Sequence, residues 1–313
     1  MSTSSTSDFR IREVSVCSED GIRHRGLFYD GGSSCTILHV HGKCGDFFQN
    51  QFISRIGRVL TTAGYNLLAL NNRGSGCISE AYRDENLIYV GGAVELFADS
   101  VLDIGGALSY LQARGHEVIL QGHSHGCEKV MWYSAERGMD GIRGIVLLSP
   151  ANSRLIQELW RTPESIAGQV ERLQASHGDD DNLSLLPPDE YGVSTSEKAY
   201  SIPTTRFSLL HWLQNPALSV FSPTQSDWSA VLRSPTFAYL GARDDLQLEG
   251  LGSMLECLQA CAPDIELFVH EHGDHQMKGI ETSVGTAILD WLRLNEFGDQ
   301  RGSPHSIRDH ARL

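Results

Sequence analysis

A serine between two glycines is the first sign of chemistry in this sequence. Gly122, Ser124 and Gly126 form the pattern Gly-x-Ser-x-Gly directly after the apolar run 118–120. On a sharp strand-to-helix turn, side chains two residues before and after the serine would collide with neighbouring backbone, which favours glycine there. Such a turn exposes the hydroxyl and aims the N–H groups of the following helix at it. The pattern therefore predicts a nucleophilic Ser124, with an ordinary glycine-rich loop as the alternative.

A serine hydroxyl becomes reactive only when a base takes its proton and a carboxylate holds that base. Asp244 follows the apolar run 235–240, and His275 follows the run 265–269. Because the carboxyl ends of parallel strands lie along one edge of a sheet, residues after separate strands can converge there. We therefore expect a catalytic triad of Ser124, Asp244 and His275.

Neighbouring residues offer alternatives for the acid and the base. Asp245 is adjacent to Asp244, but we expect the turn to aim Asp244 at the site and to leave Asp245 solvated or capping the next helix. His270 and His272 lie nearer the strand than His275, so we prefer His275 as the base.

The same histidines also spell a metal-binding pattern. Residues 270–275 read His-x-His-x-Asp-His, the zinc run of metallo-β-lactamase-like hydrolases, and closely spaced His and Asp are natural zinc ligands. That fold takes further ligands from a long downstream stretch, whereas here only 38 residues follow His275, and their histidines, His305 and His310, lie in the polar tail. We therefore predict a site with no metal and no cofactor.

A second glycine-rich corner follows the apolar run 35–40. It contains Gly42, Lys43 and Cys44, and such a corner can present unpaired backbone N–H groups. We predict that the N–H of His125 and that of Lys43 or Cys44 form an oxyanion hole.

The remaining sequence supplies the framework for these residues. Apolar runs alternate with segments of helical periodicity, which predicts a mostly parallel sheet with helices on both faces. The expected strands are an antiparallel edge pair at 9–16 and 27–29, then 35–40, 65–70, the run before Ser124, 142–148, 235–240 and 265–269. Helices are expected from a cap at Asp46 with Phe48 on the buried face, over 91–111, after Ser124, over 248–261 and before 297, with an irregular stretch after Gly76.

The segment 151–232 breaks this alternation. It is rich in Pro, Ser and charge and carries scattered aromatic residues. We expect an inserted, mainly helical lid with an apolar inner face, in which Trp160 and Trp212 contact substrate; a peripheral loop region is the alternative. Residues 1–150 and 233–297 would then form the core, and 298–313 a flexible tail.

Composition excludes several classes of partner. The net charge is −14 without a Lys/Arg cluster, so neither nucleic acid nor an anionic membrane is expected as a partner. The first residues lack the pattern of a signal peptide, and no apolar run is long enough to cross a bilayer. Seven cysteines without a Cys-x-x-Cys pair suggest free thiols, and we expect a cytoplasmic protein.

These motifs together resemble those of the α/β-hydrolase superfamily. The matching residues are His41-Gly42, Asn72 to Gly76, Gly122 to Gly126, Gly241 with Asp244, and Asp274-His275. The resemblance implies an eight-stranded sheet, a variable cap and a Ser-Asp-His triad that needs no cofactor.

The expected activity is hydrolysis of an ester, thioester or lactone of a small to medium-sized organic substrate through an acyl-enzyme. Capture of the same acyl group by an internal hydroxyl or amine would instead make the protein a cyclase, an acyltransferase or a thioesterase-like release enzyme. A zinc hydrolase and an inert binding protein are further alternatives, because fold alone does not fix function.

Overall fold

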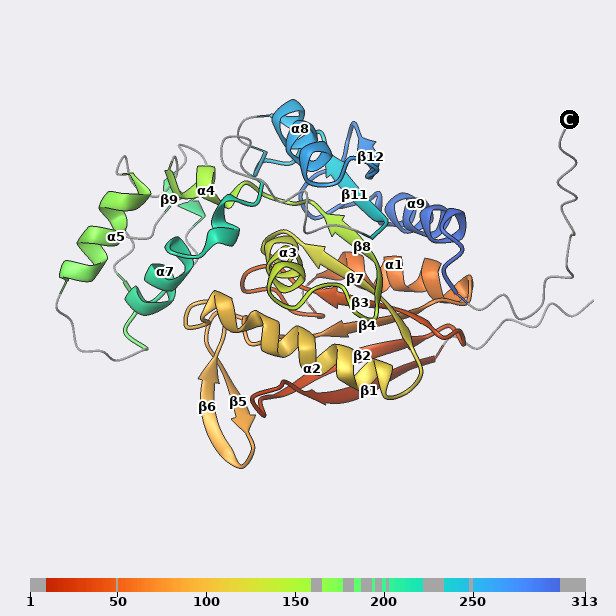
Figure 1. Ribbon diagram of the computed structural model, residues 1–313, viewed down its shortest axis with the longest axis horizontal. Helices are drawn as coiled ribbons and strands as arrows, with labels where there is room; N and C mark the ends of the chain where they lie inside the picture. The colour runs from red at the N-terminus through yellow and green to blue at the C-terminus, as the bar shows by residue number, and fades with distance from the viewer. Residues whose placement is uncertain are drawn as a thin grey trace, which may run out of the picture.

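A twisted eight-stranded sheet forms the centre of the computed structural model, which describes residues 10–48, 50–158, 165–176, 183–186, 193–194, 199–200, 203–221, 234–247 and 250–298. The strand order is β1-β2-β4-β3-β7-β8-β11-β12 (Figure 1). β1–β2 and β2–β4 pair antiparallel, and the other pairs are parallel. The predicted sheet with its antiparallel edge pair is thus confirmed. The strands are β1 Arg10–Cys17, β2 Arg23–Asp30, β3 Cys35–Val40, β4 Asn66–Leu70, β7 Glu117–His123, β8 Ile142–Leu148, β11 Thr236–Gly241 and β12 Glu266–His270.

Helices cover both faces of the sheet. α1 (Gln51–Thr62) and α9 (Glu281–Leu294) pack on one face, and α2 (Ser100–Gln112), α3 (His125–Arg137) and α8 (Leu251–Cys261) pack on the other. Val118 and Leu120 of β7 pack in the core on the side of α2, α3 and α8, while Ile119 packs in the core on the side of α1 and α9. Burial on both faces explains why the central strands read as continuous apolar runs. Among the described residues, no helix is long and apolar enough to span a membrane.

Between β8 and β11 the chain forms a smaller unit of short elements. They pack through a third apolar cluster that includes Phe97, Leu209 and Trp212, with Trp132 of α3 against it. Figure 1 shows α4, α5 and α7 together at the end of the molecule opposite α9. Trp160 lies outside the described residues, as does the predicted tail after Gly298. The elements are α4 Ser153–Ile156, α5 Ile166–Ala175, β9 Val193–Ser194, β10 Ala199–Tyr200, α7 Arg206–Leu213 and the 3₁₀ helix η3 Pro216–Ser219.

The helix predicted over 91–111 is shorter than its apolar spacing indicated. α2 begins at Ser100, after the 3₁₀ turn η1 (Phe97–Asp99). Gly91 has φ +126°, and a Cβ there would lie 2.3 Å from the carbonyl oxygen of Cys77. Tight packing against a neighbouring loop therefore holds the preceding residues in an irregular conformation that the sequence pattern does not reveal.

Two further expectations were wrong: the helix cap at Asp46 with Phe48 on the buried face, and the irregular stretch after Gly76. α1 starts after Asn50 rather than at Asp46, whose side chain instead accepts the N–H of Phe48 at 2.7 Å within a turn. Phe48 itself is 84% exposed. The stretch after Gly76, expected to be irregular, contains a hairpin of β5 (Ser79–Arg83) and β6 (Asn86–Val90).

The turn after β4 is held by a buried ion pair. Arg73 donates through Nη2 and Nε to Asp103 Oδ1 at 2.9 and 3.1 Å, and its backbone N–H reaches Oδ2 at 2.9 Å. His24 Nε2 lies 2.9 Å from the same carboxylate. Burial alone would raise the pKa of Asp103, but His24 and Arg73 outweigh burial and hold that pKa below its usual range.

We predict that Asp103→Asn lowers the free energy of unfolding by about 3 to 5 kcal/mol, because it leaves a buried charge with less compensation. Asp99→Asn is the matched control. Asp99 pairs with the same guanidinium at 3.1 Å but is 40% exposed, so its loss should cost less than about 1 kcal/mol. Urea denaturation measures both, and equal losses would contradict the role given to burial.

The Asp103→Asn effect should depend on pH. Because the folded-state pKa of Asp103 lies below its unfolded value, its stabilising contribution is present above about pH 4 and is lost as pH falls towards the lower folded value. Denaturation curves taken between neutral and acid pH should therefore show wild type and variant converging.

Candidate active site

Ser124 occupies a strained corner between β7 and α3. Its φ is 54°, a left-handed conformation that is unusual for a residue other than glycine, and its N–H donates to the carbonyl of Leu148 at 2.9 Å. A Cβ on Gly122 would lie 2.5 Å from the carbonyl oxygen of Gly126. A Cβ on Gly126 would lie 2.2 Å from that of Val40. Both flanking positions therefore require glycine for the steric reason that the pattern suggested.

The structure brings Asp244 to His275. The Nδ1 of His275 donates to the Asp244 carboxylate, at 2.9 Å from Oδ2 and 3.1 Å from Oδ1. The carboxylate side chain is buried, whereas Asp245 is exposed. Asp244 thus fixes the imidazole orientation and leaves Nε2 as the nitrogen that can exchange a proton.

Hydrogen bonds between the two loops that carry Asp244 and His275 hold this pair. After β11 and β12, the N–H of Arg243 donates to the carbonyl of Gly273 at 2.9 Å, and the hydroxyl of Tyr239 donates to that of Asp274 at 3.2 Å. A Cβ on Gly241 would lie 2.4 Å from the Gly273 oxygen. The backbones before the acid and before the base are therefore in direct contact.

His123 ties the His275 loop to the nucleophile strand. Its Nε2 donates to the backbone carbonyl of His275 at 3.0 Å, and the two rings lie 5.0 Å apart between centroids. Burial, and then the neighbouring His275, lower the pKa of His123 to about 3, so its ring is neutral at physiological pH. His123, the first variable residue of Gly-His-Ser-His-Gly, thus joins the end of β7 to the His275 loop, a contact that the sequence interpretation missed.

No hydrogen bond joins Ser124 to His275, the predicted nucleophile and base, among the described residues. Among the residues that the structure describes, Ser124 Oγ has no hydrogen-bond partner, His275 included. Catalytic hydrogen bonds commonly tighten only when substrate is bound. The His123 link places the imidazole loop beside the residue that precedes Ser124, which is the arrangement that such tightening needs.

The corner after β3 lies against the nucleophile. A Cβ on Gly42 would sit 3.0 Å from Ser124 Cβ and 3.5 Å from its Oγ. Cys44, with φ 55°, turns towards Gly92, and burial raises the pKa of its thiol to about 11. Of the two expected oxyanion donors on this corner, Lys43 is therefore the one adjacent to the glycine that touches Ser124, and the oxyanion hole itself stays a prediction.

The ring of Trp212, in α7, packs against the side chains of His125 and Lys43, two of the residues expected to donate to the oxyanion. Its ring lies 5.2 Å from that of His125 at an angle of 89°, and the Nζ of Lys43 lies 5.4 Å from its centroid. Phe97 contacts the His125 ring at 5.1 Å. The expected substrate contact Trp212 is therefore next to the nucleophile turn, whereas Trp160 falls outside the described residues.

A buried ion pair lies behind the nucleophile helix. Lys129 Nζ is 2.6 Å from Glu95 Oε2 and donates to Asn72 Oδ1 at 3.3 Å. The N–H of Asn72 donates to His41 Nε2 at 3.0 Å, and His41 Nδ1 donates to the carbonyl of Gly42 at 2.8 Å. This chain of bonds connects α3 to the corner against Ser124. Sequence reasoning missed it, because a charged residue on a helix is normally solvated.

The protonation states in this chain follow from burial and charge. Burial alone would raise the pKa of Glu95, but the Lys129 and Lys43 charges lower it to about 2. Burial and then Lys129 lower the pKa of His41 to about 4. The carboxylate is therefore ionised and the imidazole neutral at physiological pH.

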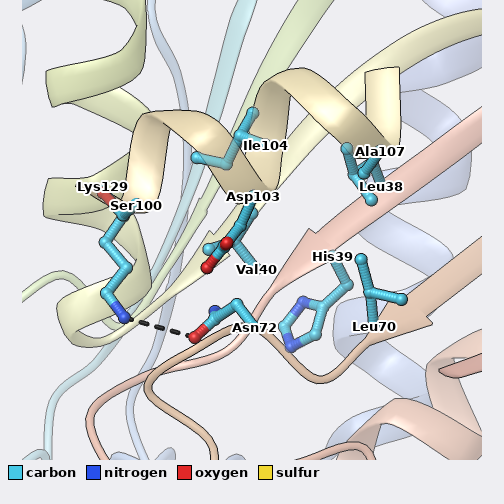
Figure 2. A pocket seen from close by; sticks show the side chains of 10 residues that line it. All are labelled: Leu38, His39, Val40, Leu70, Asn72, Ser100, Asp103, Ile104, Ala107 and Lys129. Atoms are coloured by element: carbon cyan, nitrogen blue, oxygen red, sulfur yellow. Dashed lines mark hydrogen bonds between the residues drawn. The ribbon is translucent and has the colours of Figure 1, made fainter. Parts of the chain in front are cut away.

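The small cavity in Figure 2 belongs to this framework and not to a substrate pocket. It has a volume of about 10 Å³, roughly the space for one water molecule, and is too small for an acyl substrate. It marks imperfect packing between α2 and the sheet. Its lining residues are Leu38, His39, Val40, Leu70, Asn72, Ser100, Asp103, Ile104, Ala107 and Lys129.

The histidine run does not gather as a metal site. His272 Nδ1 accepts from Arg243 Nη2 at 2.9 Å, and His270 Nδ1 accepts the N–H of His272 at 3.2 Å. His275 is directed to Asp244. In the part of the chain that the structure describes, no three His, Cys, Asp or Glu side chains are placed to hold a metal ion.

Of the comparisons with known proteins, only the one with solved structures found similar chains. No protein-family model and no curated protein sequence matches it. The Pyrococcus furiosus esterase Pf2001 is 18% identical, with 91% of this chain and 93% of that chain covered and a TM-score of 0.56. Est1E from Butyrivibrio proteoclasticus, solved with ferulic acid, is 14% identical over 90% and 98%, with a TM-score of 0.59. The α/β hydrolase GrgF from a Penicillium species is 14% identical over 91% and 99%, with a TM-score of 0.62. Such likeness establishes a shared fold.

We predict that Gly126→Ala lowers the free energy of unfolding by at least about 2 kcal/mol, because its methyl group meets a backbone oxygen that cannot rotate away. Gly252→Ala in α8 is the matched control. Among the described residues, no atom beyond the backbone of its own helix lies within 4 Å of its added Cβ, so a gain of up to about 1 kcal/mol is expected. Urea denaturation compares the two, and a neutral Gly126→Ala would refute the close crossing of α3 over β3.

Proposed function

We propose that this chain, which has the α/β-hydrolase fold, is a serine hydrolase that cleaves an ester, thioester or lactone of a small to medium-sized organic substrate. The observation that carries the proposal is the pair of His275 and Asp244, attached through His123 to the strand that ends at a strained Ser124. An imidazole with a buried carboxylate at one nitrogen is the group that activates a serine hydroxyl at the other.

The proposed reaction proceeds through an acyl-enzyme. Ser124 Oγ attacks the acyl carbonyl while His275 Nε2 takes its proton, and Asp244 stabilises the resulting imidazolium through Nδ1. The tetrahedral oxyanion accepts hydrogen bonds from the N–H groups of His125 and Lys43. Collapse expels the leaving group, which takes the proton from His275, and water activated by the same imidazole then releases the acid.

The solved structures support an ester as the bond cleaved. Pf2001 is described as an esterase, and Est1E was solved with ferulic acid, a carboxylic acid. These descriptions apply to Pf2001 and Est1E themselves. They favour ester hydrolysis here because this chain combines their fold with a His–Asp pair and a strained serine at the same sheet edge.

A fluorophosphonate probe should label the wild-type protein at Ser124 and leave Ser124→Ala unlabelled, with the site located by mass spectrometry. Asp244→Asn should slow labelling by about 10²- to 10⁴-fold, because the imidazole loses its orientation. His272→Ala is the control and should label at the wild-type rate, since His272 is exposed and bonded to Arg243.

Three results would overturn the proposal. Labelling that persists in Ser124→Ala would place the nucleophile elsewhere. Ester hydrolysis that a chelator abolishes, with unchanged Ser124→Ala activity, would favour metal chemistry in the histidine run. A folded wild-type protein that neither reacts with the probe nor cleaves any ester would be a binding protein.

A further inference from the structure

The β5–β6 hairpin carries large apolar side chains on a face that is open to solvent. Its two strands pair antiparallel, with Tyr82 opposite Leu87 and Glu80 opposite Tyr89. Because side chains alternate between the two faces of a strand, Tyr82, Leu87 and Tyr89 share one face. They are 54%, 51% and 52% exposed. Figure 1 shows the hairpin extending beyond the main sheet, on the side of the molecule opposite α9. Apolar side chains gathered in this way are typical of an interaction surface.

The outer edge of β6 is open within the part of the chain that the structure describes. β5 and β6 form a separate two-stranded sheet, so β6 pairs with no strand other than β5 there. On the far side of β5, by contrast, Arg83 forms a bridge with Ile22. β6 contains neither charge nor proline, the features with which natural proteins usually keep an edge strand from pairing. β6 is therefore the edge on which another strand can be added.

The hairpin register determines which backbone groups of β6 point outwards. The loop consists of residues 84–85, so Arg83 and Asn86 close the hairpin as a hydrogen-bonded pair. Hydrogen-bonded and non-hydrogen-bonded pairs alternate along an antiparallel ladder, which puts Leu87 and Tyr89 in non-hydrogen-bonded pairs. Their N–H and C=O groups therefore face away from β5. The same two residues thus supply the free backbone groups and the exposed apolar side chains.

This edge is complementary to itself. In an antiparallel pairing about a two-fold axis at Ile88, Leu87 of one copy lies opposite Tyr89 of the other, and the reverse. Each of these residues then exchanges its outward backbone hydrogen bonds with its partner, and their side chains meet on one face. Because β6 is uncharged, no like charges oppose each other across the axis. The match of donors, acceptors and apolar side chains with their own copies favours a second copy over an unrelated peptide.

We propose that two copies of this chain associate through β6, which pairs antiparallel with β6 of the second copy about a two-fold axis at Ile88. The two hairpins then form one four-stranded sheet that covers both open edges. This inference concerns assembly and does not depend on the proposed hydrolase activity.

The area available indicates a weak association. A covered aromatic side chain buries about 150 to 250 Å², so the exposed halves of Leu87 and Tyr89 offer on the order of 200 Å² per copy in addition to the backbone bonds. Two copies together stay well below the roughly 1,200 Å² of stable interfaces. We therefore expect a dissociation constant of about 10 μM to 1 mM, and a dimer that depends on protein concentration.

The register predicts a cross-link at one position. The two copies of Ile88 face each other in a non-hydrogen-bonded pair, whose Cα atoms lie about 4.5 Å apart, within the span of a disulfide. Cys17→Ser and Cys77→Ser first remove the exposed thiols. In that background, Ile88→Cys should give a covalent dimer with oxidised glutathione. Asn86→Cys is the matched control, because it lies opposite Val90, and its yield on non-reducing gels should be at least tenfold lower.

A second experiment measures the association without cross-linking. Sedimentation velocity between about 5 and 500 μM should show a monomer–dimer equilibrium for the wild-type protein. Leu87→Asp brings two carboxylates close to the axis and should raise the dissociation constant at least tenfold. Leu294→Asp is the matched control: it makes the same change on α9, at a side chain that is 72% exposed, and should leave the equilibrium unchanged.

Four results would overturn the proposal. A wild-type protein that stays monomeric at every concentration would remove the dimer, and a dimer that Leu87→Asp leaves intact would place the interface elsewhere. Equal cross-linking at positions 86 and 88 would refute the register. Monomers that bind phosphatidylcholine vesicles through Leu87, with no dimer, would assign the apolar face to a membrane surface. None of these measurements uses ester hydrolysis, so each outcome leaves the serine hydrolase proposal to its own test.

Discussion

The close crossing of α3 over β3 is the constraint on which the site depends. No side chain fits between them at Gly126, where an added Cβ would lie 2.2 Å from the carbonyl oxygen of Val40. Because the helix begins this close to the sheet, the chain must reverse within one residue, and Ser124 takes a left-handed conformation. The strain is held by the bond from its N–H to Leu148 and by Gly42 on the other side. One steric fact therefore positions the hydroxyl relative to two neighbouring strands.

The two histidines beside Ser124 point in different directions and do different work. His123, still in β7, reaches the His275 loop, whereas His125, in the first turn of α3, lies under Trp212 and Phe97. Burial and then His275 lower the pKa of His123 to about 3, so a neutral ring holds the His275 loop at physiological pH. The change from strand to helix at Ser124 thus directs one histidine to the His275 loop and the other to Trp212.

Much of this arrangement could be predicted from the sequence, because it depends on local patterns. Apolar runs placed the strands, and the ends of those runs placed Ser124, Asp244 and His275 at one sheet edge. What failed depends on distant partners. The apolar spacing of 91–111 predicted one helix, but Gly91 packs on Cys77 and Glu95 is drawn to Lys129, 34 residues away in the sequence. The helix cap at Asp46 failed for the opposite reason, since a local turn satisfied that side chain first.

Glu128 and Lys129 show how the same helix turn serves two purposes. Both side chains are buried, yet Lys129 pairs with Glu95, whereas burial raises the pKa of Glu128 well above its usual value. A buried charge is tolerated when a partner of opposite charge is in contact, and a buried acid without one is protonated instead. Consecutive residues on a helix point about 100° apart, so Lys129 meets the framework of Asn72 and Glu95 while Glu128 meets His125 and Ser153. Lys129 therefore holds the framework behind α3, while Glu128 holds the imidazole of the residue that follows Ser124.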